Sequence, residues 1–343
     1  MKGIILHGGH GTRLRPLTHT GPKQLLKIAN KPMSQYALED LRDAGITDIA
    51  IILGDIFPDK VKEFYGDGSR FGVTITYIFQ NEPRGIAHAI GLCENFIGND
   101  KFVVYLGDNI LRKGLSSYVS TFSKSESSAM ILLSEVSNPK QFGVAKIVNN
   151  ILVEIIEKPE NPPSNYAVIG VYFLTHEIFP IIKNLKPSWR NELEITDALQ
   201  SLILTNKTPS YDFVNGWWKD TGTPNDILHA NQLILESISE LESTNSILEN
   251  NIKIDSTAKI IPPVLFEKNC KILGNCTIGP YVSIGEKTTI IDSKIKNSII
   301  MNDCIIDSNI MIENSIISDN TEITGNFNPK LTVILGERSK ISF

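Results

Sequence analysis

The sequence has few cysteines, few histidines and no long run of apolar residues. Its 343 residues include four cysteines and six histidines. Four cysteines in a chain of this length do not make a disulfide framework, and no two of them form a Cys-x-x-Cys pair, so we expect no structural zinc site. No stretch approaches the roughly 20 apolar residues of a membrane span, and no leader peptide is recognisable. These absences predict a cytoplasmic protein with no membrane partner.

The sequence also lacks a block of like charges. Its formal net charge of −5 is spread over the whole length, so there is no electrostatic footprint for nucleic acid. We therefore expect small-molecule partners. Hydrophobic residues at 41% and charged residues at 21% are ordinary for a globular protein. A chain of 343 residues exceeds what one hydrophobic core usually supports, which predicts two domains.

Residues 1 to about 225 alternate between strand-like apolar runs and helical patterns. This alternation is typical of βαβ units and predicts a Rossmann-like α/β domain with helices on both faces of a mainly parallel sheet. Ligands then bind beyond the carboxyl ends of the strands. The expected strands are 3–6, 49–53, 73–79 and 102–106, and the expected helices are 33–44, 59–64 and 86–96. Further strands at 129–136, 144–148, 151–156 and 168–173 have fewer helices between them, which predicts an antiparallel addition and hence a mixed sheet.

The chain changes character after residue 224. Apolar residues at helical spacing predict a helix over 224–241, and polar residues 242–251 follow it. We expect a catalytic domain over 1–235, a linker over 236–251 and a second domain over 252–343.

The second domain has a repeat of six residues. Isoleucine or an equivalent residue recurs at this spacing from Ile254 to Ile290. The register continues with two short steps through Ile295, Ile300, Ile306 and Ile312, and then through Ile317 and Ile323. A fixed short period indicates a solenoid, and three hexads make one triangular coil, so we expect about four coils. Residues four positions after each repeat start should fill the interior, and they include Cys270, Cys276, Cys304 and Lys294. Such hexads resemble the left-handed parallel β-helix of the hexapeptide-repeat family, and the handedness is implied by that resemblance alone.

The N-terminal segment is rich in glycine and cations. Gly8, Gly9 and Gly11 follow the first strand, and Thr12 and Arg13 come directly after them. Glycines let backbone N–H groups approach phosphate oxygens, while guanidinium groups neutralise phosphate charge. The pattern is neither the dinucleotide-binding motif nor a P-loop. It indicates a phosphate-binding segment, to which Lys23 adds a further cation.

Residues 6–16 together with Pro22-Lys23-Gln24-Leu25-Leu26 resemble the signature of sugar-phosphate nucleotidylyltransferases. Later segments have the order and approximate spacing of glucose-1-phosphate thymidylyltransferases, over roughly residues 1–235. These segments are Leu106-Gly107-Asp108-Asn109, Phe142-Gly143-Val144, Ile156-Glu157-Lys158-Pro159, Glu192-Leu193-Glu194-Ile195-Thr196-Asp197 and Trp217-Trp218-Lys219-Asp220-Thr221-Gly222. With the appended repeat, the chain resembles the long form of that family.

The resemblance implies a division of roles. Arg13 and Lys23 would bind the triphosphate, and Asp108 and Asp220 would hold Mg²⁺. Lys158 would hold the sugar phosphate, and these five are the catalytic set. The other nucleotide-binding residues would be Leu6, Gly8, Gly9, Gly11, Thr12, Gln24, Gln80 and Gly85, with Gln80 reading the pyrimidine edge and Gly85 leaving room for the base. Sugar contacts would come from Asn109, Gly143, Glu157, Tyr172 and Glu194.

The implied reaction suits these residue types. A sugar 1-phosphate oxygen attacks the α-phosphorus of dTTP or UTP in line and pyrophosphate leaves, so the protein positions two anions and needs no covalent nucleophile. Magnesium takes one or two carboxylates and completes its shell with phosphate oxygens. His7 and His10 stand where the family usually has small residues. We expect His7 to pack beside the base and His10 to be solvated.

Several alternatives stay open. Preference for UTP or for an amino-sugar 1-phosphate is one. A bifunctional uridylyl- and acetyltransferase is disfavoured because acyl transfer generally uses a histidine base and none follows His229. A GDP-mannose-type pyrophosphorylase is disfavoured by Gln80 and by residues 217–222. A non-catalytic regulatory homologue is disfavoured by the full catalytic set. We expect the repeat domain to drive homo-oligomerisation.

Overall fold

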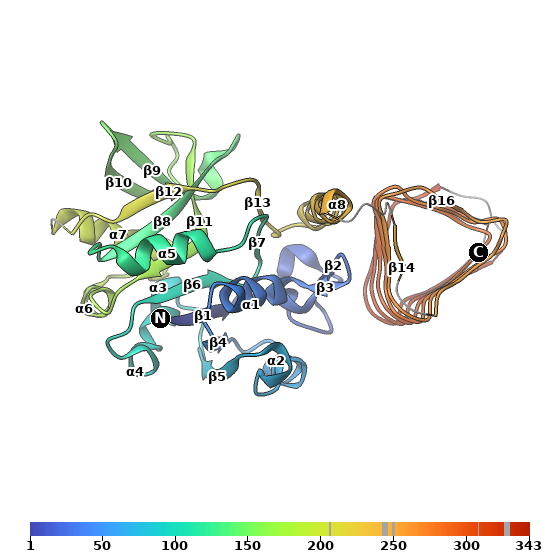
Figure 1. Cartoon of the computed structure of the whole chain (residues 1–343), viewed down its shortest axis with the longest axis horizontal. Helices are drawn as coiled ribbons and strands as arrows, with labels where there is room; N and C mark the ends of the chain where they lie inside the picture. The colour runs from blue at the N-terminus through green and yellow to red at the C-terminus, as the bar shows by residue number, and fades with distance from the viewer. Residues whose placement is uncertain (206, 242–245, 249–250, 308, 326–329) are drawn as a thin grey trace. The chain divides into compact units, whose positions relative to one another are not determined.

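The computed structural model describes residues 1–205, 207–241, 246–248, 251–307, 309–325 and 330–343 (Figure 1). The chain forms two compact units: Met1–Gly9 with Ser34–Trp218, and His10–Met33 with Lys219–Phe343. These units do not follow the predicted limits at residues 235 and 251, which stay a prediction. None of the helices in the described part of the chain has the length and apolarity that crossing a bilayer demands.

The first unit is built on a nine-stranded mixed sheet. Its parallel half has the order β6-β1-β4-β5 and contains the four strands that the alternation predicts. The bounds are β1 Lys2–His7, β4 Asp48–Leu53, β5 Thr74–Phe79 and β6 Phe102–Leu106. Buried β-branched and aliphatic residues dominate β1, β4 and β6, as expected for strands covered on both faces.

The predicted antiparallel addition is confirmed. β11 pairs antiparallel with β6, β8 and β9, and β10 pairs antiparallel with β9. An unpredicted strand, β12, pairs parallel with β8. The register of β11 against β8 shifts between Val168 and Tyr172. The bounds are β8 Ala129–Glu135, β9 Gly143–Val148, β10 Ile151–Glu157, β11 Tyr166–Leu174 and β12 Ser210–Phe213, with the short strands β7 Asn109–Leu111 and β13 Trp218–Asp220.

Helices cover both faces of this sheet. One core holds Ile4 and Val104 of the sheet together with Ile90, Phe179 and Leu199 of α3, α6 and α7. On the other face Tyr105 donates a hydrogen bond to Asp40 of α1, and Phe122 of α5 packs on Phe173. The bounds are α1 Met33–Asp43, α2 Pro58–Tyr65, α3 Ile86–Gly91, α4 Glu94–Ile97, α5 Ser116–Lys124, α6 Ile178–Asn184 and α7 Ile195–Leu204.

The predicted single helix over 86–96 is wrong. Two short helices, α3 and α4, replace it because the last turn of α3 tightens to a hydrogen bond from Cys93 N to Ile90 O, three residues back. The apolar pattern continues through this break, so periodicity alone does not reveal it.

The second unit begins with residues 10–33, which form two 3₁₀ turns and a small hairpin. The bounds are η1 Thr12–Leu14, η2 Lys23–Leu25, β2 Lys27–Ile28 and β3 Lys31–Pro32. The predicted helix over 224–241 is confirmed as α8 Pro224–Leu241.

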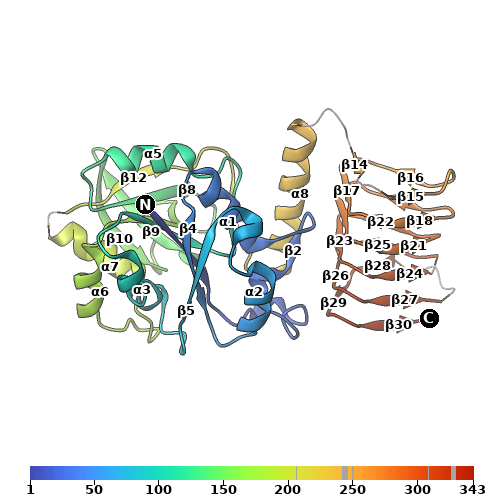
Figure 2. The same ribbon diagram turned by 60° about the horizontal axis from the view of Figure 1, so that its bottom comes forward.

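The repeat folds as a parallel β-helix with the architecture of the left-handed family. Three parallel sheets of six, six and five strands form its walls, and the coils have a triangular outline in Figure 1 and stack in Figure 2. The first wall holds β14 Ser246–Leu248, β17 Val264–Phe266, β20 Val282–Ile284, β23 Ser298–Ile300, β26 Ile316–Ile317 and β29 Ile334–Leu335. The second holds β15 Lys253–Ile254, β18 Lys271–Leu273, β21 Thr289–Ile291, β24 Ile305–Asp307, β27 Glu322–Thr324 and β30 Lys340–Ser342. The third holds β16 Lys259–Ile260, β19 Thr277–Ile278, β22 Lys294–Lys296, β25 Met311–Glu313 and β28 Lys330–Leu331.

The interior matches the hexad pattern with two corrections. Cys270, Cys276 and Cys304 are buried, free thiols, as predicted, and burial raises the pKa of Cys304 to about 12. Lys294, in contrast, is exposed and Ser293 takes the inner position, because the coil there is shorter than three full hexads. The expected four coils are too few, since β14 and strands after residue 325 extend the walls.

Candidate functional site

The carboxyl end of β1 carries an unusual buried histidine. His7 is 5% exposed, and neither ring nitrogen has a hydrogen-bond partner among the described residues. Burial lowers the pKa of His7 to about 3, and the nearby negative charge of Asp108 opposes this only partly. The imidazole ring meets Tyr65 edge-on, with 5.9 Å between centroids. His7 is therefore a neutral, apolar-packed ring beside the acidic end of β6.

Asp108 follows β6 and is held by its neighbour Asn109. The Asn109 Nδ2 donates to Asp108 Oδ1 at 3.0 Å. The Asn109 Oδ1 accepts from Trp218 Nε1 at 2.6 Å and from Gly170 N at 3.2 Å. A Cβ atom at Gly170 would lie 2.7 Å from the Asn109 amide. Asn109 therefore positions Asp108, and glycine at 170 is what lets the amide approach β11.

A cluster of acidic groups surrounds one arginine at the end of β10. Arg190 Nη1 lies 3.6 Å from Glu157 and 3.3 Å from Glu194, and its Nη2 lies 3.1 Å from Glu192. Thr196 donates to Glu157 Oε2 at 3.1 Å. We call Glu157, Arg190, Glu192, Glu194 and Thr196 the glutamate cluster.

The charges of the glutamate cluster are not balanced. Burial, followed by the negative charge of Glu194, raises the pKa of Glu157, and Lys158 and Arg190 oppose the shift without cancelling it. Lys158 Nζ lies 4.0 Å from Glu157 Oε1, and the Lys158 side chain is 38% exposed. The cluster thus holds more carboxylate than its own cations neutralise, beside a lysine that faces solvent.

Two other predicted sugar-contact residues lie beside this cluster. A Cβ atom at Gly143 would lie 2.6 Å from Thr196 and 3.3 Å from Glu157, so glycine is needed there. Burial raises the pKa of Tyr172 strongly, and the charges of Glu157, Asp108 and Glu194 raise it further. Tyr172 therefore feels the charges of both the glutamate cluster and Asp108.

The end of β5 presents Gln80 with one face already engaged. Its Nε2 donates to Gly85 O at 3.2 Å and meets His88 Nδ1 at 2.9 Å. Its Oε1 points toward Gly8, where an added Cβ atom would lie 3.8 Å from that oxygen. The amide is thus fixed with its acceptor outward.

Gly85 has a packing role of its own. Its φ of 101° suits glycine, and a Cβ atom there would lie 2.5 Å from the backbone oxygen of Leu193. The backbone of residues 84–87 is hydrogen-bonded to Leu193: Leu193 N donates to Arg84 O, and Ala87 N donates to Leu193 O. This close approach explains the glycine, while its predicted role of leaving room for a base stays a prediction.

The second unit gathers the predicted cations on a glycine-lined loop. Gly11 has φ 59°, and a Cβ atom there would lie 2.8 Å from Thr18 and 3.2 Å from Lys23. Thr18 donates to Gly11 O at 2.8 Å. The guanidinium group of Arg13 packs on Gly222, where an added Cβ atom would lie 2.9 Å from Arg13 Nη2. Arg13 and Lys23 are therefore both placed by contacts to glycine.

The predicted residues thus fall into two groups, one in each unit. The first unit holds Leu6, Gly8, Gly9, Gln80, Gly85, Asp108, Asn109, Gly143, Glu157, Lys158, Tyr172 and Glu194. The second unit holds Gly11, Thr12, Arg13, Lys23, Gln24 and Asp220. Within the first, Asp108 is bound by Asn109, and Gly143, Glu157, Lys158 and Glu194 lie in or beside the glutamate cluster. Within the second, Gly11 and Lys23 adjoin.

Sequence reasoning gave no role to Arg190, Gly170 or His88, and it used Trp218 only as part of the segment 217–222 that carries the resemblance. Arg190 lies two residues before the acidic segment 192–197, and that position is a signal that could have found it. Gly170 and His88 carry no such signal, because nothing in their sequence neighbourhood indicates the partners they contact.

The comparisons with known proteins define the class first. The family model described as "Nucleotidyl transferase" matches residues 2–237, and the model described as "GMPPB C-terminal domain" matches residues 243–342. The chain belongs to the nucleotidyl transferase family.

Individual relatives are similar over most of their length. The "Low-salt glycan biosynthesis nucleotidyltransferase Agl11" of Haloferax volcanii is 44% identical over 90% of this chain and 89% of its own. A glucose-1-phosphate thymidylyltransferase of Streptomyces antibioticus is 38% identical over 99% of both chains.

Two solved structures are similar to this chain in both sequence and fold. A Bacillus anthracis protein assigned as a glucose-1-phosphate thymidylyltransferase, in complex with sucrose, is 46% identical, with a TM-score of 0.65 over 68% of this chain and 94% of its own. A UDP-glucose pyrophosphorylase complexed with UDP-glucose is 30% identical, with a TM-score of 0.61 over 68% of this chain and 98% of its own. The chain is accordingly an enzyme of sugar-phosphate nucleotidyl transfer.

Proposed function

We propose that this enzyme forms dTDP-glucose and pyrophosphate from dTTP and glucose 1-phosphate in a Mg²⁺-dependent reaction. The full-length similarity to a glucose-1-phosphate thymidylyltransferase supports the substrates. The observation that carries the sugar half is the glutamate cluster, where carboxylates outnumber cations. Carboxylates accept hydrogen bonds from sugar hydroxyls, and the exposed Lys158 beside them is a partner for the phosphate.

The orientation of Gln80 supports a pyrimidine with a protonated ring nitrogen. Its outward Oε1 is an acceptor, and His88 and Gly85 occupy its donor side. Thymine and uracil carry an N–H at position 3, whereas cytosine carries an acceptor there. An outward acceptor therefore favours dTTP or UTP over CTP.

Asp108 and Asp220 are the proposed ligands of a divalent cation. Among the described residues no three His, Cys, Asp or Glu side chains gather into a metal cluster. This donor set fits Mg²⁺, which keeps one or two carboxylates and takes phosphate oxygens and water for the rest. When bound, the cation neutralises charge on the phosphates.

The remaining residues act by position and charge. Lys158 holds the attacking phosphate, and Arg13 and Lys23 stabilise the triphosphate, Arg13 on the departing pyrophosphate. In-line phosphoryl transfer needs positioning and charge neutralisation more than a covalent nucleophile. Sugar hydroxyls bound by Glu157 and Glu194 orient the attacking oxygen.

A substrate panel tests this proposal. Purified full-length chain is incubated with Mg²⁺, one of dTTP, UTP, CTP or GTP, and glucose, glucosamine or mannose 1-phosphate, and pyrophosphate release is followed. We expect the highest kcat/KM for dTTP with glucose 1-phosphate. Chelation of the metal should abolish pyrophosphate release. A preference for GTP with mannose 1-phosphate would contradict the proposed substrates, and no release with any pair would contradict catalysis itself.

A further inference from the structure

A small hairpin in the second unit lies directly after Lys23. Residues 27–32 form it from β2 and β3, and we call it the Lys27 hairpin. Its turn residues, Ala29 and Asn30, have φ values of 45° and 64°, the left-handed conformation of a tight two-residue turn. The hairpin presents Lys27, the Ala29 backbone N–H and the Asn30 amide to other parts of the same unit.

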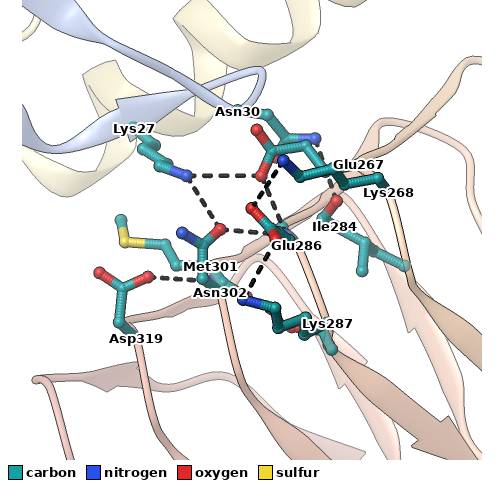
Figure 3. Close-up of polar contacts among 12 residues, drawn as sticks. Lys27, Asn30, Glu267, Lys268, Ile284, Glu286, Lys287, Met301, Asn302 and Asp319 are labelled. Carbon is teal, nitrogen blue, oxygen red and sulfur yellow. Dashed lines mark hydrogen bonds and ion pairs between the residues drawn. The ribbon is translucent and has the colours of Figure 1, made fainter. Parts of the chain in front are cut away.

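Two of these groups bind the β-helix (Figure 3). Lys27 Nζ donates to Asn302 Oδ1 at 2.8 Å and lies 3.4 Å from Glu267 Oε2. Asn30 Nδ2 donates to the backbone oxygen of Ile284 at 3.0 Å. The Lys27 side chain is only 18% exposed. An ion pair shielded to this degree is screened less than a surface pair.

The third group binds α8. The Ala29 N–H donates to Asn231 Oδ1 at 2.9 Å, and the same oxygen accepts from Ser283 Oγ at 3.0 Å. Asn231 and Ser283 are fully buried. One buried amide oxygen therefore joins the hairpin, α8 and the β-helix.

The acceptors for Lys27 are themselves held in place. Glu286 N donates both to Glu267 Oε2 at 2.9 Å and to Asn302 Oδ1 at 3.0 Å. Asp319 Oδ1 accepts from Asn302 N at 2.8 Å. A Cβ atom at Gly285 would collide with the Asn302 side chain, so glycine makes room for it. Glu267 and Asn302 therefore form a preorganised binding site for the Lys27 ammonium group.

The hairpin is tied closely to Lys23. Leu26 N donates to Lys23 O at 3.0 Å, and Met33 N donates to Leu26 O at 3.1 Å. Lys23 in turn packs against Gly11 of the glycine-rich loop. Movement of the hairpin would therefore be transmitted to Lys23 through a short, hydrogen-bonded stretch.

We propose that the β-helix positions the triphosphate-binding cations by holding the Lys27 hairpin, which makes Lys27 and Asn30 positioning residues for nucleotide binding. The inference rests on the proposed function, since it takes Lys23 to bind the triphosphate. Releasing the hairpin lowers the fraction of molecules in which Lys23 is correctly placed, and the apparent nucleotide affinity falls by that fraction. The β-helix then supports nucleotide binding by positioning Lys23, in addition to the homo-oligomerisation expected of it from the sequence.

The test compares Lys27→Met with Lys268→Met in the full-length chain. Lys268 belongs to the same β-helix and lies 3.7 Å from Glu286, but its side chain is 57% exposed, whereas that of Lys27 is 18% exposed. Loss of a shielded charged hydrogen bond should raise the KM for the nucleotide about tenfold in Lys27→Met. The KM for the sugar phosphate should not change, Lys27→Arg should restore most of the nucleotide KM, and Lys268→Met should resemble the wild type.

A merely structural role for Lys27 would raise both KM values or neither, and either result overturns the inference. If Lys27→Met does not fold by circular dichroism, Asn30→Ala removes one hydrogen bond from the same hairpin. That variant should raise only the nucleotide KM, by about threefold, and an unchanged value overturns the inference equally. Absence of turnover in the wild-type chain with every substrate pair would instead refute the proposed function.

Discussion

The molecule contains two polar clusters of opposite character. In the first unit, the glutamate cluster sets Arg190 against Glu157, Glu192 and Glu194, and the pKa of Glu157 is raised by burial and by Glu194. In the second unit, Lys27 meets acceptors that backbone N–H groups also occupy. The first cluster holds more carboxylates than cations, whereas the acceptors of Lys27 are each bound by a backbone N–H group as well. We infer that unbalanced charge marks a place for a ligand, and that acceptors shared between a side chain and the backbone hold chain segments together.

The largest expected effect comes from Asp108→Asn. The variant keeps an oxygen for the Asn109 hydrogen bond and loses only the charge, so folding should survive. We expect kcat to fall by about 10³-fold, the scale on which removal of a preorganised electrostatic group acts. Pyrophosphate release at saturating Mg²⁺ measures this, with the exposed Asp100→Ala as control. A near-normal rate would mean that Asp108 does not serve the metal.

His7→Phe tests how the buried histidine of the first unit affects the pH dependence of the free energy of unfolding. The pKa of His7 falls from 6.5 in the unfolded chain to about 3 because of burial. The unfolded chain therefore binds more protons than the folded chain between these pH values. The contribution of neutral His7 to the free energy of unfolding is complete above pH 6.5 and is lost as the pH falls toward 3. At pH 4.5 this loss amounts to ~3 kcal/mol.

Phe removes the titrating group and keeps a ring beside Tyr65. Urea unfolding at pH 7 and pH 4.5 should show a drop between the two pH values that is smaller in His7→Phe than in the wild type by ~3 kcal/mol. An equal drop in both proteins would show that the His7 ring is not protonated on unfolding in this range.

Glu157→Gln separates binding from stability. The raised pKa means that the folded chain binds more protons than the unfolded chain above the ordinary pKa of glutamate, so ionised Glu157 destabilises the fold at neutral pH and the penalty disappears as the pH falls. We expect Glu157→Gln to melt no lower than the wild type at pH 7, while the KM for the sugar phosphate rises about tenfold. A lower melting temperature with an unchanged KM would make Glu157 a structural residue.

His88→Leu gives the smallest effect. Without the imidazole, the Gln80 amide can turn and present its NH₂ group outward, which suits cytosine. The ratio of kcat/KM for dTTP to that for dCTP should fall about fivefold, less than the loss of a full hydrogen bond. The exposed His176→Leu is the matched control. An unchanged ratio in His88→Leu would show that Gln80 needs no orientation from His88.

The fold could be predicted where the signal is local and repeated. Strands β1, β4, β5 and β6 follow from short apolar runs, and the β-helix follows from its period. The hexad pattern misplaces Lys294 because shortened coils shift the register without changing the composition. The break between α3 and α4 depends on how one turn closes, and the apolar pattern does not record that.

The site was predictable only in part. Asp108, Glu157 and Lys23 follow from resemblance to a family, and their roles stay predictions. Arg190 and His88 become visible only when the fold brings their partners beside them. The Lys27 contact joins residues 240 positions apart in the sequence, so no local pattern could have indicated it.

The most direct test of the two clusters measures two variants against two substrates. For Glu157→Gln and Lys27→Met, KM is determined for the sugar phosphate and for the nucleotide in the full-length enzyme. If the glutamate cluster binds the sugar and the Lys27 hairpin positions the nucleotide-binding cations, Glu157→Gln raises only the KM for the sugar phosphate. Lys27→Met then raises only the KM for the nucleotide. Equal effects of either variant on both substrates would contradict that division.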